Sequence, residues 1–157
     1  MDGVSDAAFR QIVDIHGHSS VLFTEFVPVE AIKANAPRVL DAFVKHDTDT
    51  PTIAQIYGTD LEGYRQAAFI ACDLGFDGLD INMGCPAKTV LQRGGGAALI
   101  GNYSLAKKII SACLEAIKKS GTEIPLSVKT RITGEKNFSR QWFDFLSGFN
   151  LAEITVH

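Results

Sequence analysis

The sequence has few cysteines, no long apolar run and no excess of positive charge, and each absence excludes a class of protein. Its three cysteines, at positions 72, 85 and 113, form no CxxC pair, so neither a disulfide framework nor a zinc site is expected. No stretch of about 18 consecutive apolar residues is present, which argues against a membrane span. The formal net charge is -3, whereas proteins that grip polyanions usually have a basic surface.

What is present is an ordinary globular composition. The chain has 157 residues, of which 46% are hydrophobic and 21% charged, enough for one sizeable core. Its first residues include neither a basic nor an apolar leader segment, so we expect a cytoplasmic protein. His16 and His18 lack partners at metal-ligand spacing and residues 47–49 are interpreted as a polar loop, so no metal site is expected.

Short apolar runs alternate with longer amphipathic stretches. The predicted strands are residues 21–27, 52–57, 78–82, 125–131 and 153–157. The predicted helices are residues 5–15 (with Ser5 as N-cap), 28–34, 38–44, 61–74 (with Asp60 as N-cap and Gly75 as its stop), 104–120 and 139–147. Alternating strands and helices predict a parallel sheet with helical crossovers.

Side chains on the predicted strands separate by parity into two sets. The aliphatic set comprises Leu79, Ile81, Leu126, Val128, Ile154 and Val156, and the polar set comprises Asp80, Asn82, Ser127, Lys129, Arg131, Thr155 and His157. A doubly wound sheet tends to be apolar on both faces, whereas a barrel presents polar groups inward at its carboxyl end. We therefore predict an α/β fold of the TIM-type (β/α)8 barrel class.

The barrel is expected to be incomplete. Five strands are clear in the sequence, whereas a closed barrel of this type has eight. If residues 1–3 end a first strand, His157 ends the sixth. The sequence thus predicts a fragment that runs from about the first or second strand to the sixth.

Cys85 is the strongest candidate for chemistry. It lies between Gly84 and Pro86 just after a predicted strand, and these neighbours favour a fixed turn rather than a helix. A thiol stays mostly protonated at neutral pH and can donate its proton to a carbanion-like centre. Nucleophilic catalysis would need a nearby base, and no histidine is close in sequence. Cys72 and Cys113 lie within predicted helices and are expected to be buried and structural.

Several polar residues near the predicted strand ends have two interpretations each. Gln55 suits the edge of a heterocycle, and Lys129 is either a solvated residue or a charge for an anionic ligand. His157 is either a ligand-binding imidazole or the residue before a loop. The glycine run 94–96 allows close approach to a ligand or phosphate, or forms a flexible loop. Together these residues favour a binding site.

The run from Asp80 to Lys88, with the glycine-rich run 94–99, closely resembles the signature of the tRNA-dihydrouridine synthases. Residues 1–6 resemble the opening of that family, Pro-Met-x-Gly-x-Thr/Ser-Asp, without its proline. Residues 23–26, 55–58, 127–131 and 155–157 follow in the order and spacing of the family. The resemblance therefore spans the whole chain.

The resemblance implies flavin-dependent reduction of specific uridines in tRNA to 5,6-dihydrouridine, with FMN as cofactor and NADPH as reductant. Cys85 corresponds to the general acid that protonates C5 of the uracil, and hydride reaches C6. Asn82 matches the residue that orients the uracil. The FMN-binding positions correspond to Met1, Asp2, Gln55, Lys129 and His157, and the expected tRNA contacts are Lys88 and Arg131.

The resemblance also predicts which parts of the family's domain organisation the chain contains. The last barrel strands of the family, with its FMN-phosphate site, and its helical tRNA-binding domain have no counterpart in residues 1–157, which are expected to form a partial FMN-binding barrel domain. The intact parent is expected to be a monomer. Two alternatives stay open: another FMN-dependent barrel oxidoreductase, such as a dihydroorotate dehydrogenase relative, and an inactive truncated fragment.

Overall fold

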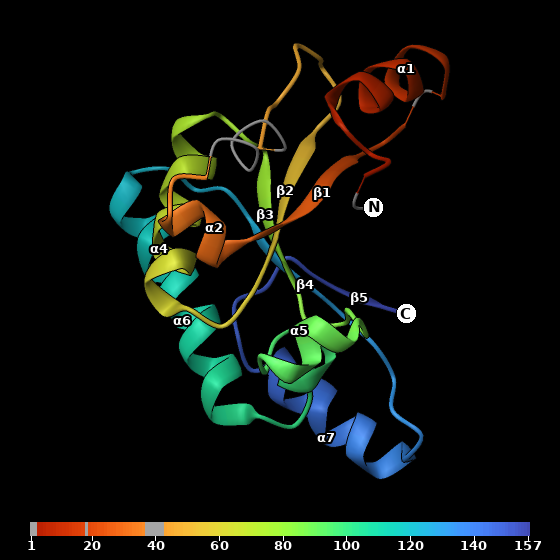
Figure 1. Ribbon diagram of the computed structural model, residues 1–157, viewed down its shortest axis with the longest axis vertical. Helices are drawn as coiled ribbons and strands as arrows, with labels where there is room; N and C mark the ends of the chain where they lie inside the picture. Colours follow the sequence, from red (N-terminus) through yellow and green to blue (C-terminus); the bar gives the residue numbers. More distant parts are fainter. Residues whose placement is uncertain (1–2, 18, 37–42) are drawn as a thin grey trace.

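An open, all-parallel sheet forms the centre of the computed structural model, which describes residues 3–17, 19–36 and 43–157 (Figure 1). Its five strands are β1 (Leu22–Pro28), β2 (Thr52–Tyr57), β3 (Gly78–Asn82), β4 (Leu126–Thr130) and β5 (Glu153–Val156). They lie in the order β1-β2-β3-β4-β5, and each neighbouring pair is parallel. A doubly wound sheet reverses its order at a switch point, so this sequential order is consistent with part of a barrel.

The strands agree with the sequence prediction, with one irregularity. The bounds of β2 and β3 are as predicted, and the others differ by one or two residues. In β1 the pairing with β2 shifts between Phe23 and Phe26, an irregularity that the sequence pattern did not reveal. At the start of the chain, Met1 and Asp2 lie outside the described residues, and Gly3 is in a turn.

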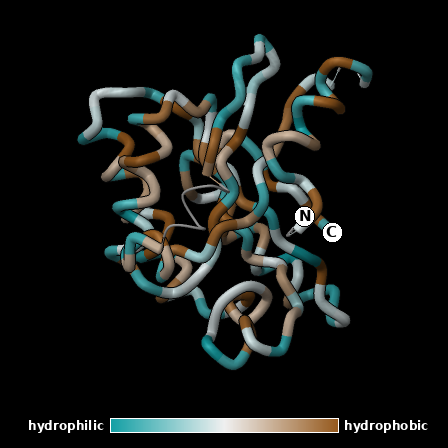
Figure 2. The backbone as a smooth tube through the Cα atoms, turned by 45° about the horizontal axis from the view of Figure 1, so that its top comes forward, coloured by the Kyte–Doolittle hydropathy of each residue, from teal (hydrophilic) through white to brown (hydrophobic). Residues whose placement is uncertain are grey.

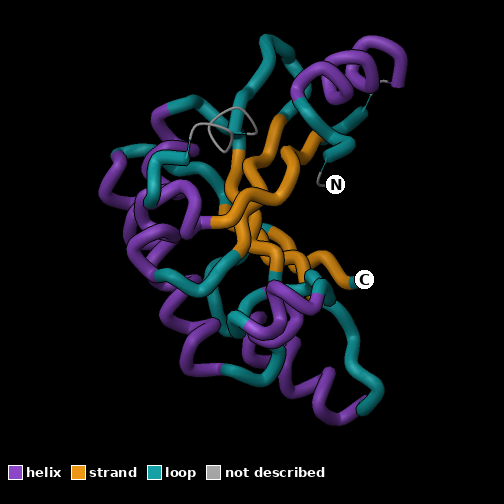
Figure 3. The backbone as a smooth tube through the Cα atoms, viewed as in Figure 1, coloured by secondary structure: helices purple, strands orange, loops and turns teal. Residues whose placement is uncertain are grey.

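Helices connect the strands and cover one face of the sheet. The described helices are α1 (Ala7–Gly17), α2 (Val29–Lys33), α4 (Leu61–Asp73), α5 (Lys88–Gln92), α6 (Tyr103–Ser120), α7 (Lys136–Ser147) and the short 3-10 helix η1 (Gly96–Leu99). Helix α4 packs against both α2 and α6, on the left in Figure 3. Most of the predicted helix 38–44 lies outside the described residues, whereas α5 and η1 were not predicted.

Local capping explains the ends of α4 and α6. The Asp60 carboxylate accepts a hydrogen bond from the backbone N–H of Gly63 at 2.7 Å, which confirms the predicted N-cap. Gly75, with φ of 71°, follows α4, and Gly121, with φ of 78°, ends α6. Glycine reaches this left-handed conformation without steric cost, so both helices end where the sequence predicts.

Two predicted helix starts were wrong. Asp6, rather than Ser5, caps α1, because its carboxylate accepts from the N–H of Phe9 at 2.7 Å. Helix α7 begins at Lys136, three residues before the predicted start. The Ser139 hydroxyl accepts from the N–H of Thr133 at 2.9 Å, so it ties the loop before α7 to the helix instead of starting it.

The core lies between the aliphatic face of the sheet and the helices. Figure 2 shows hydrophobic residues concentrated along the strands and hydrophilic ones in the outer loops. The aliphatic set is buried at Leu79, Ile81, Leu126 and Val128, all of which are at most 2% exposed. Full burial of each such side chain stabilises the fold by about 1.5–3 kcal/mol. Val156 departs from the prediction, since 49% of its surface is exposed.

Within the described residues, no helix combines the length and the apolar character that crossing a membrane requires.

Candidate active site at the carboxyl ends of the strands

A cavity of about 640 Å³ opens on the polar face of the sheet. Gln55 of β2, Asn82 of β3 and Lys129 of β4 line it together with Phe23 and Phe26 of β1. The structure therefore brings together three of the predicted site residues, which are far apart in sequence. The two phenylalanines add an apolar wall, so the cavity suits a flat, partly polar ligand.

A chain of side-chain hydrogen bonds runs beneath this cavity. The Asp80 carboxylate accepts from the Ser127 hydroxyl at 2.7 Å and from the Gln55 amide nitrogen at 2.8 Å. The Asn82 amide nitrogen donates to the Gln55 oxygen at 3.2 Å, and the Asn82 oxygen accepts from the N–H of Gly84 at 3.0 Å. The polar residues of three strands thus form one connected network.

The electrostatics of the network centre on Asp80, which is 1% exposed. Burial raises the pKa of Asp80 above its ordinary value, because a charged carboxylate loses its hydration. The hydrogen bonds from Ser127 and Gln55 and the positive charge of Lys129 oppose this effect, while Glu153 adds to it. The surroundings of Asp80 therefore supply both donors and a cation for its ionised form.

Cys85 lies on a turn whose backbone is hydrogen-bonded at both Gly84 and Cys85. A side chain at Gly84 would bring its Cβ within 3.3 Å of the Thr130 backbone, so the strand end packs closely on β4. The Arg131 guanidinium donates to the Gly84 carbonyl at 2.7 Å, and the Cys85 carbonyl accepts from the N–H of Ala97 at 3.0 Å. The Cys85 thiol is free and half-buried.

The glycine run packs directly on this turn. A Cβ at Gly96, whose φ is +56°, would lie 2.5 Å from the Cys85 carbonyl oxygen. A Cβ at Gly95 would lie 3.4 Å from the Gly58 carbonyl oxygen. Both glycines are buried. This packing differs from the two interpretations made from the sequence, because the glycines contact the chain's own backbone at the cysteine turn.

Arg131, His157 and Lys88 lie apart from the cavity lining. The Arg131 guanidinium lies 3.5 Å from the His157 ring nitrogen Nδ1, and His157 is exposed. Lys88 is exposed at the first position of α5. Met1 and Asp2 fall outside the described residues. The roles predicted for these five residues stay predictions.

Sequence reasoning did not single out Asp80 or Ser127 as site residues. Both belong to the polar parity set, and the signal that identifies Asp80 is a charged residue between the apolar neighbours Leu79 and Ile81 on a short strand. Every residue of β3 is buried, so a charge there requires partners. The parity argument alone could not say which groups those partners are.

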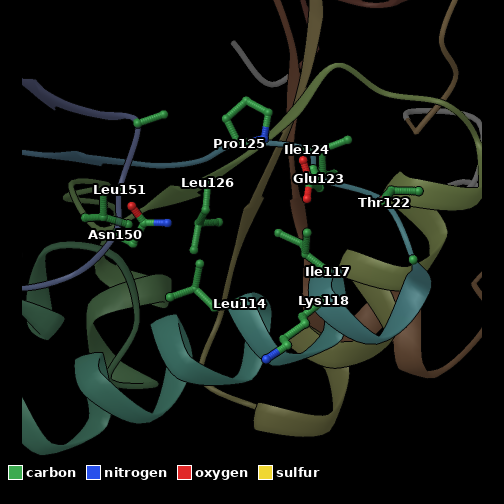
Figure 4. Close-up of a pocket in the computed structure, with 12 residues that line it drawn as sticks. Leu114, Ile117, Lys118, Thr122, Glu123, Ile124, Pro125, Leu126, Asn150 and Leu151 are labelled. Carbon is green, nitrogen blue, oxygen red and sulfur yellow. The ribbon is translucent and has the colours of Figure 1, made fainter.

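A second cavity of about 680 Å³ lies at the opposite end of the sheet (Figure 4). Its lining is mainly aliphatic and includes Leu114 and Ile117 of α6, Leu126 at the start of β4, and Leu151 just before β5. Active sites of parallel barrels form at the carboxyl ends of the strands. This cavity is therefore not a candidate for catalysis.

The sequential, open parallel sheet with a polar cavity on one face is that of an α/β protein and is consistent with part of a barrel. The family model described as Dihydrouridine synthase (Dus) matches residues 1–157. The chain belongs to the dihydrouridine synthase family.

Individual relatives agree with this membership. The chain is 32% identical over 160 residues to the probable tRNA-dihydrouridine synthase 2 of Bacillus subtilis (strain 168), a match that covers 100% of this chain and 47% of the relative. It is 31% identical over 160 residues, with the same coverage, to the probable tRNA-dihydrouridine synthase of Staphylococcus aureus (strain COL). The chain thus spans about half the length of the curated relatives it matches.

Proposed function

We propose that the protein carrying this chain reduces specific uridines in tRNA to 5,6-dihydrouridine, with FMN as cofactor and NADPH as reductant. The observation that carries the proposal is the half-buried thiol of Cys85, fixed on a turn that continues from the polar network of the cavity. Because residues 1–157 cover about half of the relatives, the activity is proposed for the whole protein, in which this chain forms part of a closed barrel.

The cavity fits the ring system of a flavin. Lys129 supplies a cation suited to the negative charge of a reduced flavin pyrimidine, and Gln55 offers an amide for its edge. Phe23 and Phe26 would face the apolar part of the ring system. Met1, Asp2 and His157 are further proposed contacts of the cofactor.

The proton for the reaction comes from Cys85. When bound, reduced FMN supplies the hydride to C6 of the uracil. Cys85 gives its thiol proton to C5, and the carbonyls of Gly84 and Cys85, bonded to Arg131 and Ala97, hold the turn in place. Asn82 orients the uracil through its amide. A neutral thiol suits this role, since a general acid must hold its proton until the transition state.

The target base must leave the RNA stack to reach such a cavity. Lys88 is exposed next to the turn that carries Cys85, and Arg131 lies beside His157 at the ends of β4 and β5. We propose that these two cations contact the tRNA backbone near the extruded nucleotide. The net charge of -3 indicates that such contacts are local rather than spread over the surface.

Replacement of Cys85 tests the proposal. In the full reading frame that contains residues 1–157, Cys85→Ala should keep FMN bound and lower dihydrouridine formation about 10²- to 10⁴-fold, the range that general acids contribute. The measurement is mass spectrometry of tRNA that lacks the modification, after incubation with FMN and NADPH. Cys72→Ala, in the core at α4 and outside the cavity lining, is the matched control and should retain activity. Undiminished product from Cys85→Ala would refute the assignment.

A substrate screen separates the alternative flavin enzyme. If the protein reduces or oxidises free pyrimidines such as dihydroorotate and leaves tRNA unchanged, the dihydroorotate dehydrogenase-like reaction is the better description. Reduction of tRNA alone supports the proposal. The same purified protein serves both arms, so loss of folding would be visible as loss of both reactions.

A further inference from the structure

The side-chain amides of Gln55 and Asn82 lie between a hydrogen-bond acceptor at one end and a hydrogen-bond donor at the other. At one end, a carboxyl oxygen of Asp80 accepts a hydrogen bond from the Gln55 amide nitrogen at 2.8 Å. At the other end, the N–H of Gly84 only donates, and it reaches the Asn82 oxygen at 3.0 Å. The amides meet each other at 3.2 Å. Both ends therefore require the same orientation of the two amides.

The reversed orientation would leave polar groups without partners in a buried place. The Gln55 oxygen would face the Asp80 carboxylate, and the Asn82 amide N–H would face the N–H of Gly84. Asp80 is 1%, Asn82 5% and Gln55 8% exposed, so water cannot readily replace the lost partners. An unpaired buried donor or acceptor is costly, and the observed orientation is the one that satisfies all four groups.

Burial raises the pKa of Asp80, and two hydrogen-bond donors and a cation oppose this effect. Ser127 donates to its second carboxylate oxygen at 2.7 Å. Lys129 lines the same cavity, and its charge acts on Asp80 in the same direction, against burial and the charge of Glu153. The two oxygens of Asp80 thus have one donor each, from two different strands.

We propose that Asp80 is a positioning residue, whose carboxylate fixes which amide atoms of Gln55 and Asn82 face the cavity. The ligand that reads this pattern is a planar heterocycle with an imide edge, in which an N–H lies between two carbonyl oxygens. The flavin pyrimidine and the uracil base share this edge. The proposal rests on the proposed function for the identity of the ligand, whereas the amide network itself does not depend on it.

A purely structural role for Asp80 also predicts a loss of stability in Asp80→Leu, because the buried donors of Gln55 and Ser127 would be left unpaired. The comparison with asparagine therefore tests whether the acceptor oxygen is what orients the amides. Leucine has the branched shape of aspartate with a larger volume, and it cannot accept from Gln55. Asparagine keeps an acceptor oxygen for Gln55, and the N–H of Gly84 still holds the far end of the network in its present orientation.

The experiment compares Asp80→Leu with Asp80→Asn in the full-length protein. Hydrogen exchange of the peptide that contains Gly84, followed by mass spectrometry, reports the network without any ligand. FMN affinity, measured by quenching of flavin fluorescence, reports the cavity. We expect Asp80→Leu to speed exchange at Gly84 roughly threefold or more and to weaken FMN binding about tenfold, the factors that loss of one or two net hydrogen bonds carries. Asp80→Asn should stay within about threefold of the unsubstituted protein in both measurements.

The outcomes separate this proposal from the proposed function. Unchanged exchange at Gly84 in a folded Asp80→Leu protein overturns the positioning role. Equal changes in Gly84 exchange and in FMN affinity for Asp80→Leu and Asp80→Asn also overturn the positioning role, because the acceptor oxygen that asparagine keeps would then have no effect. If the unsubstituted protein does not bind FMN, the proposed function fails, and the exchange data still decide the role of Asp80. Should Asp80→Leu not fold, Asp80→Val, which suits a strand, takes its place.

Discussion

Gly96 should be the glycine in the run 94–96 whose replacement disturbs the cysteine turn most. In Gly96→Ala the new methyl group would lie 2.5 Å from the Cys85 carbonyl oxygen and 3.0 Å from the Cys85 Cβ, at a φ of +56°. The matched control is Gly94→Ala, because Gly94 also has a positive φ, +80°, but only the Thr59 methyl group lies near, at 3.9 Å. The two variants therefore share backbone strain and differ in the clash with Cys85.

The expected magnitudes follow from these two terms. A non-glycine residue in the left-handed region costs about 1–2 kcal/mol. A forced overlap in a packed interior adds about 1–3 kcal/mol. Gly94→Ala should thus lose only the first term, and Gly96→Ala should lose roughly 2–5 kcal/mol in all, as the sum of the two.

Urea denaturation followed by circular dichroism measures this difference. With a slope of about 2 kcal/mol per molar urea, the two midpoints should differ by roughly 0.5–1.5 M. Under the proposed function, Gly96→Ala should also lower dihydrouridine formation more than Gly94→Ala does, since the clash moves the residue that bears the thiol. Equal midpoints and equal activities for the two variants would refute the reasoning that Gly96 is required by its contact with Cys85.

Two further predictions concern stability. Trp142→Phe should lower the free energy of unfolding by about 1–3 kcal/mol, because the fully buried indole N–H donates to the Thr130 hydroxyl at 2.9 Å and its removal leaves that oxygen unpaired. Urea denaturation followed by circular dichroism measures this loss, and an unchanged midpoint contradicts the prediction. Hydrogen bonds from Thr48 and Thr50 lower the pKa of Asp14, so its stabilising effect is present above an unfolded-state pKa of about 3.9 and is lost as the pH falls through the folded value. Asp14→Ala should therefore show its full deficit at pH 7 and a smaller one near pH 3, whereas a pH-independent deficit would exclude the charge as the cause.

The strand pattern was predictable because the aliphatic parity set packs into the core, although Asp80 and Asn82 on the other face of β3 are buried as well. The apolar runs at 52–57 and 78–82 have the same bounds as β2 and β3, and part of the polar set, including Asn82 and Lys129, lines the cavity. The short helix α5 was missed because five residues carry no amphipathic repeat. Isolated helices of that length are unstable, so tertiary contacts rather than local sequence decide whether they form.

The site was predictable in its members but not in its connections. The resemblance selected Cys85, Asn82, Gln55 and Lys129, and the structure places the last three around one cavity. The role of Asp80 could not be predicted, because it depends on which atoms of two amides face each other across neighbouring strands. Sequence spacing carries no information on such orientations.

The backbone contact between Gly96 and Cys85 has a consequence for protein engineering. The cysteine turn and the glycine run are separated in sequence by α5, yet the Ala97 N–H and the close packing that the absent side chain of Gly96 allows complete the turn. A transplant of residues 82–86 alone into another parallel barrel would leave the Cys85 carbonyl without this partner. A graft would therefore need residues 82–99 as one piece, together with an arginine placed as Arg131 is for the Gly84 carbonyl.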